Sequence, residues 1–168
     1  AVGSQTGSNG ELSYTVLDNV TVENNYHGAI YSCGGHLVVN GGTYQTSFAN
    51  DGSPDAGALN NKGTAIINGG NFVGNGNATY AVITTGALTI KNAVVTGAHG
   101  AVAISGGTAV IEDGTFTLNG VAGQTDHVMY VEKDTDVTIN GGTFESKSTS
   151  VGGASVICSS TSNLTING

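Results

Sequence analysis

A six-residue pattern recurs along the chain and constrains its fold more than any other feature of the sequence. The most regular copies are residues 39–44, 67–72 and 139–144, and the last of these reads Ile-Asn-Gly-Gly-Thr-Phe. With diverged copies included, the pattern begins at Leu17, Val39, Ile67, Ile90, Ile111, Ile139 and Ile166. Successive copies begin 22, 28, 23, 21, 28 and 27 residues apart. Such spacings are typical of a solenoid whose coils differ in loop length.

A second short apolar segment precedes each copy of the pattern. Residues 80–83 (Tyr-Ala-Val-Ile) and 100–104 (Gly-Ala-Val-Ala-Ile) are examples. These segments are short, often β-branched, and bounded by Gly, Ser or Asn, which is typical of strands. No stretch shows a sustained helical period, and 28 of the 168 residues are Gly, which disfavours helix. The sequence therefore predicts an all-β parallel β-helix of six complete coils and the start of a seventh.

The repeats assign residues 11–168 to a single β-solenoid domain. Residues 1–10 are rich in Gly and Ser and are interpreted as a linker or a weak cover for the first coil. The last repeat is incomplete, because it stops at Gly168. An uncapped solenoid end exposes unpaired strand edges. We therefore expect either a fragment of a longer repeat array or an end that docks onto another molecule.

The third residue of every copy of the pattern is Gly, Asn or Asp. These residue types tolerate a positive φ, whereas the Cβ of most others clashes in the left-handed region. A left-handed residue is therefore expected at the bend of every coil. The column consists of Asn19, Gly41, Gly69, Asn92, Asp113, Gly141 and Gly168.

Stacked coils are expected to place like residues in register. An internal apolar and aromatic ladder is predicted at Val22, Tyr44, Phe72, Val95, Phe116 and Phe144. A hydrogen-bonded ladder of polar side chains is predicted at Asp18, Asn40, Asn68, Asn140 and Asn167. Lys91 and Glu112 interrupt this second ladder on adjacent coils. At a strand spacing of about 4.8 Å they are expected to pair as surface charges.

The charge balance excludes several partner classes. The formal charge is −8, from 12 acidic residues against four Lys and no Arg. Binding to nucleic acid needs a basic patch, so no nucleic-acid partner is expected. No membrane insertion is expected either, because no apolar run approaches the roughly 20 residues that span a bilayer. Abundant Gly, Thr, Ser and Asn favour an extracellular protein, either secreted or anchored at the cell surface.

The pattern at residues 139–144, preceded by strands such as residues 28–31 (Gly-Ala-Ile-Tyr), resembles the right-handed β-helix repeats of large bacterial surface proteins. It is also similar to the β-helical carbohydrate-binding domains of cellulose-degrading clostridia. The similarity covers residues 11–168. It implies a right-handed parallel β-helix, export from the cell, and polysaccharide binding with calcium as a cofactor.

Three histidines precede aligned strand residues, namely His27 before Ile30, His99 before Val102 and His127 before Tyr130. They are predicted to share one column, with His99 and His127 on neighbouring coils. Two imidazoles one strand spacing apart, with Asp126 alongside, can hold a divalent metal. The alternative is a solvent-facing column of turns in which His has no ligand role.

The loops after the aromatic ladder vary most in length and are predicted to project from one side of the solenoid. The longest contains Phe48, Asp51 and Asp55. Its oxygen-rich composition suits calcium, although it has no spaced ligand motif such as that of an EF-hand. Aromatic faces for sugar rings are predicted at Tyr26, Phe48 and Tyr80. Ordinary loop packing is the alternative for each.

The two cysteines, Cys33 and Cys158, fall in the first and sixth coils. Five strand spacings separate these coils, or about 24 Å, whereas a disulfide needs Cα atoms within about 7 Å. The two are therefore predicted to be free thiols within one chain. If molecules stack end to end, they are candidates for an intermolecular contact.

Catalysis is not expected from this sequence. Lyase chemistry of the kind found in β-helices uses a calcium site and a basic residue, but the chain has no Arg and its four Lys are dispersed. Glycoside hydrolysis needs two carboxylates about 5–9.5 Å apart, and no such pair stands out. Asp134 and Asp136 lie in a turn beside Lys133 and are interpreted as solvated charge.

These features predict a non-catalytic adhesin or polysaccharide-binding module of a bacterial surface protein. Its partner is expected to be a polysaccharide or a host or cell-surface glycan. The alternative is a structural stalk or a filament subunit that self-associates end to end. A polysaccharide lyase or hydrolase is less favoured, and ice binding by a Thr array is the least favoured.

Overall fold

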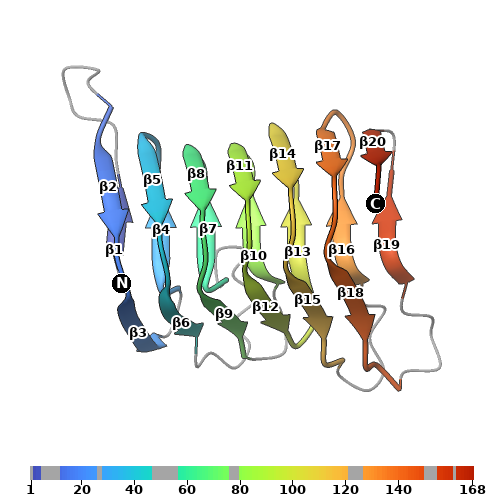
Figure 1. Cartoon of the computed structure of the whole chain (residues 1–168), viewed down its shortest axis with the longest axis horizontal. Helices are drawn as coiled ribbons and strands as arrows, with labels where there is room; N and C mark the ends of the chain where they lie inside the picture. Colours follow the sequence, from blue (N-terminus) through green and yellow to red (C-terminus); the bar gives the residue numbers. More distant parts are fainter. Residues whose placement is uncertain are drawn as a thin grey trace.

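The computed structural model describes residues 2–4, 12–25, 28–46, 57–75, 80–120, 127–149, 155–160 and 162–168. Every regular element in these ranges is a β-strand, and the strands form three parallel sheets that run along the long axis of the molecule (Figure 1). Strand numbers rise by three from neighbour to neighbour, so each coil contributes one strand to each sheet. The predicted all-β parallel β-helix is confirmed.

The chain visits the three sheets in a fixed order. The first sheet consists of β1 (Val2–Ser4), β4 (Ile30–Ser32), β7 (Leu59–Asn61), β10 (Tyr80–Thr84), β13 (Gly100–Ile104), β16 (His127–Val131) and β19 (Ser155–Ser159). The second consists of β2 (Tyr14–Leu17), β5 (His36–Val39), β8 (Thr64–Ile67), β11 (Ala87–Ile90), β14 (Thr108–Ile111), β17 (Asp136–Ile139) and β20 (Asn163–Ile166). The third consists of β3 (Val20–Asn25), β6 (Gly42–Thr46), β9 (Asn71–Gly74), β12 (Val94–Gly97), β15 (Thr115–Leu118) and β18 (Thr143–Ser146).

The repeated pattern forms the bend between the second and third sheets. Its first residues pair with one another at the ends of the second-sheet strands, as Val39 does with Ile67 and Ile90 with Ile111. From Val39 to Ile139 these side chains are buried, whereas Ile166 in the last coil is 54% exposed. The short connections on both sides of the second sheet keep this register constant from coil to coil.

The predicted aromatic ladder is present and fills the core under the third sheet. Register pairs Tyr44 with Phe72, Phe72 with Val95, and Phe116 with Phe144. The Tyr44 and Phe72 rings stack with centroids 5.1 Å apart, and the Phe116 and Phe144 rings with centroids 4.7 Å apart. The two stacked ring pairs bury large apolar areas, so this ladder is a main source of cohesion.

Tyr44 is the polar member of the ladder. Its side chain is fully buried, and its hydroxyl donates a hydrogen bond of 2.9 Å to the carbonyl oxygen of Gly41. Burial raises the pKa of the Tyr44 phenol above 10.0, and the negative charge of Asp18 raises it further. Folding therefore favours the protonated phenol.

This raised pKa predicts a loss of stability at high pH. Above pH 10.0 the folded protein retains a Tyr44 proton that the unfolded chain releases. Because stability falls with pH wherever the folded state binds more protons, the contribution of Tyr44 is complete below that pH and is lost as pH rises through the raised pKa. At neutral pH, Tyr44→Phe should cost about 1 kcal/mol through the lost hydrogen bond. Urea unfolding at increasing pH should show this gap closing above pH 10.0, and a constant gap would contradict the expectation.

In three of the coils the left-handed residue lies one position later than predicted. Asn19 has a φ of 53°, as expected, and in the second coil both Gly41 (157°) and Gly42 (104°) have a positive φ. In the third, fifth and sixth coils the positive φ belongs only to the following glycine, for example 142° at Gly114. In the fourth coil neither Asn92 nor Ala93 has a positive φ. The prediction of a left-handed residue at the third position of every copy was therefore wrong.

Neighbouring coils approach one another closely at the fourth position of the pattern. A Cβ built on Gly42 would overlap the carbonyl oxygen of Val20, and a Cβ on Gly114 would lie 2.7 Å from the carbonyl oxygen of Ala93. Where the fourth residue of the pattern is Gly42 or Gly114, it therefore has two reasons to be Gly, its φ and the absence of space.

The polar ladder beside the bend is present, but the predicted charge pair is replaced by another contact. Asn68 donates a hydrogen bond of 2.8 Å to Asn40, and Asn167 donates one of 2.9 Å to Asn140. Glu112, which was expected to pair with Lys91, accepts a hydrogen bond of 2.8 Å from Asn140. The carboxylate thus takes the place of an amide oxygen in the ladder.

The inner column of the first sheet contains a buried polar contact that the sequence did not indicate. Asn61 is fully buried, and its Nδ2 donates hydrogen bonds of 2.9 Å to Thr84 Oγ1 and 2.9 Å to the Ala87 carbonyl. Gly63 N donates in turn to Asn61 Oδ1 at 3.1 Å. These bonds offset the desolvation of the amide and tie the turn after β7 to the next coil.

The first sheet extends into the Gly- and Ser-rich segment at residues 1–10. Strand β1 pairs with β4, with Val2 opposite Ile30 and Gly3 opposite Tyr31. Residues 5–10 lie outside the described residues. Among the described residues there is no helix long and apolar enough to cross a membrane.

Candidate functional site

Only part of the predicted site set falls within the described residues. Tyr80, His99, His127 and Cys33 are described with their side chains, whereas only the strand position of Cys158 is described. The other predicted residues lie outside the described ranges, namely Tyr26, His27, Phe48, Asp51, Asp55 and Asp126.

The structure brings two of the predicted residues together with a third ring on the outer face of the first sheet. The Tyr80 and Tyr130 rings stack with centroids 6.4 Å apart and planes 29° from parallel. The His127 ring stacks on Tyr130 at 5.8 Å and 17°. All three side chains are partly exposed. We call Tyr80, Tyr130 and His127 the aromatic cluster.

The outward direction of these rings follows from strand periodicity. In β16 the buried residues Val128, Met129 and Val131 point into the core, which leaves His127 and Tyr130 on the outer face. Strand β10 has the same burial pattern, and it places Tyr80 outward in the same way. Each of these strands has two consecutive buried residues. Its two outward side chains therefore lie three positions apart, whereas in a regular strand they would lie two apart.

Gly100 allows the cluster to form across the strand that separates its members. Strand β13 lies between β10 and β16, and Gly100 pairs with Tyr80. A Cβ on Gly100 would overlap the ring of Tyr80. The missing side chain therefore leaves room for the Tyr80 ring to lean over β13 towards Tyr130.

The predicted histidine column is not formed as expected. Val102 pairs with Met129, so His127 lies opposite Gly100 and not opposite His99. His99 is buried at 9% exposure in the connection between β12 and β13, whereas the His127 ring packs on Tyr130. Among the described residues, no three His, Cys, Asp or Glu side chains come together as metal ligands.

A further aromatic residue, Tyr31, lies on the same face. Lys62 Nζ donates a hydrogen bond of 2.6 Å to the Tyr31 hydroxyl and lies 5.1 Å from the centre of its ring. The sequence did not single out Tyr31 or Tyr130. Aligning Ile30 with Met129, as the structure does through β7, β10 and β13, would have placed both tyrosines in one column.

One cysteine lies in a turn and the other in a strand of the first sheet. Cys33 is a free, exposed thiol in the turn between β4 and β5. Cys158 pairs with Tyr130 in the column that begins at Gly3. The first sheet begins with β1 and ends with β19. If two copies stacked end to end in this register, β19 of one would lie beside β1 of the other, and Cys158 would lie next to Gly3.

A shallow oxygen-rich hollow lies at the turn between β16 and β17. It has a volume of about 500 Å³ and is lined by Asp134, Thr135, Asp136, Ser162 and Asn163. A calcium ion takes about 6–8 oxygen ligands. In this hollow one of the Asp136 carboxylate oxygens already accepts a hydrogen bond of 2.6 Å from Asn163 Nδ2. The hollow carries solvated charge and no assigned role.

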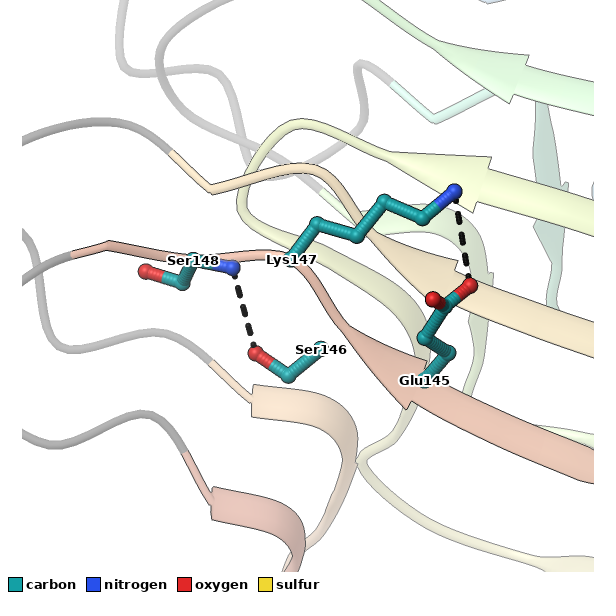
Figure 2. Close-up of polar contacts among 4 residues, drawn as sticks. All are labelled: Glu145, Ser146, Lys147 and Ser148. Carbon is teal, nitrogen blue, oxygen red and sulfur yellow. Dashed lines mark hydrogen bonds and ion pairs between the residues drawn. The ribbon is translucent and has the colours of Figure 1, made fainter.

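The charged side chains at the end of β18 form a surface pair. Lys147 Nζ lies 3.3 Å from Glu145 Oε2, and the Ser148 amide donates a hydrogen bond of 3.4 Å to Ser146 Oγ. Figure 2 shows both contacts as dashed lines. The Lys147 and Glu145 side chains are 56% and 52% exposed. Exposed pairs of this kind contribute little to stability, about 0–1 kcal/mol, and this one lies on the third sheet, not on the face with the aromatic cluster.

No protein-family model, curated protein or solved structure matches this chain.

Proposed function

We propose that this protein is an extracellular, non-catalytic module of a bacterial surface protein that binds polysaccharide through the outer face of its first sheet. The observation that carries the proposal is the aromatic cluster, in which Tyr130 stacks against both Tyr80 and His127 on an exposed sheet face.

The chemistry of the cluster suits sugar rings. One face of a pyranose ring presents C–H groups, which pack against an aromatic ring, while its hydroxyl groups bond to polar atoms at the edge. Tyrosine and histidine offer both an apolar face and a polar atom. Rings that already stack on one another lose little freedom on binding.

Binding without cleavage is favoured by the residue types around the cluster. The described residues in the outward columns through Tyr80 and Tyr130 are apolar, amide, Gly, Ser, Cys, Tyr or His, and none of them is a carboxylate. Hydrolysis of a glycoside bond normally needs two carboxyl groups that flank the bond. We therefore propose that the protein holds the glycan and leaves it intact.

Affinity electrophoresis tests this function. The purified chain is run through gels cast with neutral or acidic polysaccharides, with and without a chelator, and the mixtures are assayed for new reducing ends. We expect retardation on at least one glycan without new reducing ends. Tyr130→Ala should weaken retardation at least about tenfold, as expected for a central aromatic contact.

The matched control for this test is Tyr14→Ala. Tyr14 is 70% exposed on the second sheet, away from the aromatic cluster, and its removal should leave retardation unchanged. New reducing ends would contradict the non-catalytic proposal. Absence of retardation on every glycan would overturn the binding proposal in favour of a stalk or filament role.

A further inference from the structure

One outward column of the first sheet combines the two tyrosine positions with three residues between them. The strand register aligns these residues without a shift from β4 to β16. In strand order the column reads Tyr31, Asn60, Ile83, Ala103 and Tyr130.

Partly exposed and buried side chains alternate along this column. Tyr31, Ile83 and Tyr130 are partly exposed. Asn60 and Ala103, which lie between them, are only 2% and 5% exposed. Every second coil therefore presents a large apolar or aromatic surface, and we call Tyr31, Ile83 and Tyr130 the ridge.

The spacing of the ridge follows from the solenoid. Neighbouring strands are about 4.8 Å apart, so adjacent ridge residues are about 9.6 Å apart and the whole ridge spans about 19 Å. The direction of the ridge is the long axis of the molecule, along which the strands succeed one another (Figure 1).

Both ends of the ridge have a neighbour that restrains the ring. Lys62 bonds to the hydroxyl of Tyr31, and Tyr130 stacks against Tyr80 and His127. Restrained rings keep their spacing in the free protein, which lowers the entropic cost of binding a ligand with the same repeat.

A regular apolar repeat of this length suits one class of glycan. In an extended chain of β-1,4-linked pyranoses each sugar is turned over relative to its neighbour, so the same ring face returns at every second sugar. The two-sugar repeat of such a chain is close to two strand spacings. Chains with α-1,4 links coil instead and do not present equivalent faces in a straight line.

The charge of the protein narrows the class further. The formal charge of −8 repels anionic polymers, and the ridge itself carries no charged side chain. A neutral chain is therefore the better complement to this face.

From the alternation and its spacing we infer that the ridge binds a neutral, extended β-1,4-linked polysaccharide lying parallel to the solenoid axis. Every second sugar packs on Tyr31, Ile83 or Tyr130. This inference rests on the proposed function and adds to it the linkage, charge and direction of the glycan.

Calorimetric titration with oligosaccharides of defined length and linkage tests the inference. The probes are cellobiose, cellohexaose and chitohexaose, with maltohexaose as the α-1,4-linked control. We expect one of the β-1,4-linked hexamers to bind at least about tenfold more tightly than cellobiose and than maltohexaose, because only an extended hexamer reaches more than one ridge residue.

Variants at the two ends of the ridge separate the contributions of Tyr31 and Tyr130 to binding. Tyr31→Ala should weaken hexamer binding about tenfold and leave disaccharide binding at the Tyr130 end unchanged. Tyr130→Ala should weaken both, and Tyr14→Ala on the second sheet should weaken neither. Unchanged urea unfolding midpoints show that each variant is folded.

The outcomes distinguish this inference from the proposed function. Equal affinity for cellobiose and the hexamers, equal affinity for maltohexaose, or hexamer binding that is insensitive to Tyr31→Ala would overturn the inference and leave a glycan-binding module. Tighter binding of carboxymethyl cellulose than of hydroxyethyl cellulose would overturn the neutral class. Absence of binding to all glycans would overturn both proposals.

Discussion

Phe72→Ala is expected to lower the free energy of unfolding by about 3–5 kcal/mol, the range found for large-to-small changes at buried aromatic residues. Phe72 is fully buried and stacks on Tyr44 with ring centroids 5.1 Å apart. Removing the ring leaves a cavity between two coils, and the hydrogen bonds of the parallel sheets prevent the coils from closing it.

Urea unfolding followed by circular dichroism measures this loss, with Tyr14→Ala as the matched control. Tyr14 is 70% exposed, so removing its ring should change stability by less than about 0.5 kcal/mol. A loss at Phe72 that is no larger than the loss at Tyr14 would contradict the aromatic ladder as a source of cohesion.

Gly42→Ala should have an effect of similar size through the backbone. The φ of Gly42 is 104°, and an added Cβ would overlap the carbonyl oxygen of Val20 in the preceding coil. Backbone strain and steric overlap each cost about 1–3 kcal/mol. We therefore expect a loss of about 3 kcal/mol or more in the free energy of unfolding, measured by urea titration.

Gly69→Ala is the control for this substitution. Gly69 is the third residue of its copy of the pattern, where the sequence predicted a left-handed φ, but in the structure it has no positive φ. Its added Cβ would meet only the Asn40 carbonyl oxygen at 3.5 Å, an ordinary contact. Its effect should stay within about 1 kcal/mol. A larger loss at Gly69 than at Gly42 would favour the sequence-based assignment of the bend over the structural one.

The sequence predicted the parts of the fold that repeat in every coil. The first residue of each pattern copy and the apolar or aromatic residue five positions later are buried in all central coils, because both point into the core from strands of constant register. A repeat that buries the same positions leaves a clear period in the sequence, and the fold follows from that period.

The bend was misplaced by one residue because composition alone does not separate two adjacent positions. Gly41 and Gly42 both satisfy the requirement for a left-handed residue. In the structure both have a positive φ, and the Val20 carbonyl of the neighbouring coil leaves no room for a side chain at Gly42. That contact is between coils and has no signature within one copy of the pattern.

The candidate site was predicted only in part for a similar reason. All five residues of β13 are buried, so this strand shows no alternation from which its register could be derived. Aligning the coils of the chain by sequence consequently matched Val102 to Tyr130, whereas the structure pairs Val102 with Met129. That difference of one residue concealed the relation between Tyr31 and Tyr130 and gave the expected histidine column.

The most direct test of the central claim is to map which face of the protein a glycan touches. At 16.6 kDa the isotopically labelled chain is suited to two-dimensional NMR during titration with cellohexaose and chitohexaose. We expect chemical-shift changes concentrated on β4, β10 and β16, around Tyr31, Ile83 and Tyr130. Changes concentrated on the second sheet, or no change at saturating concentrations of either sugar, would contradict the assignment of the first sheet as the binding face.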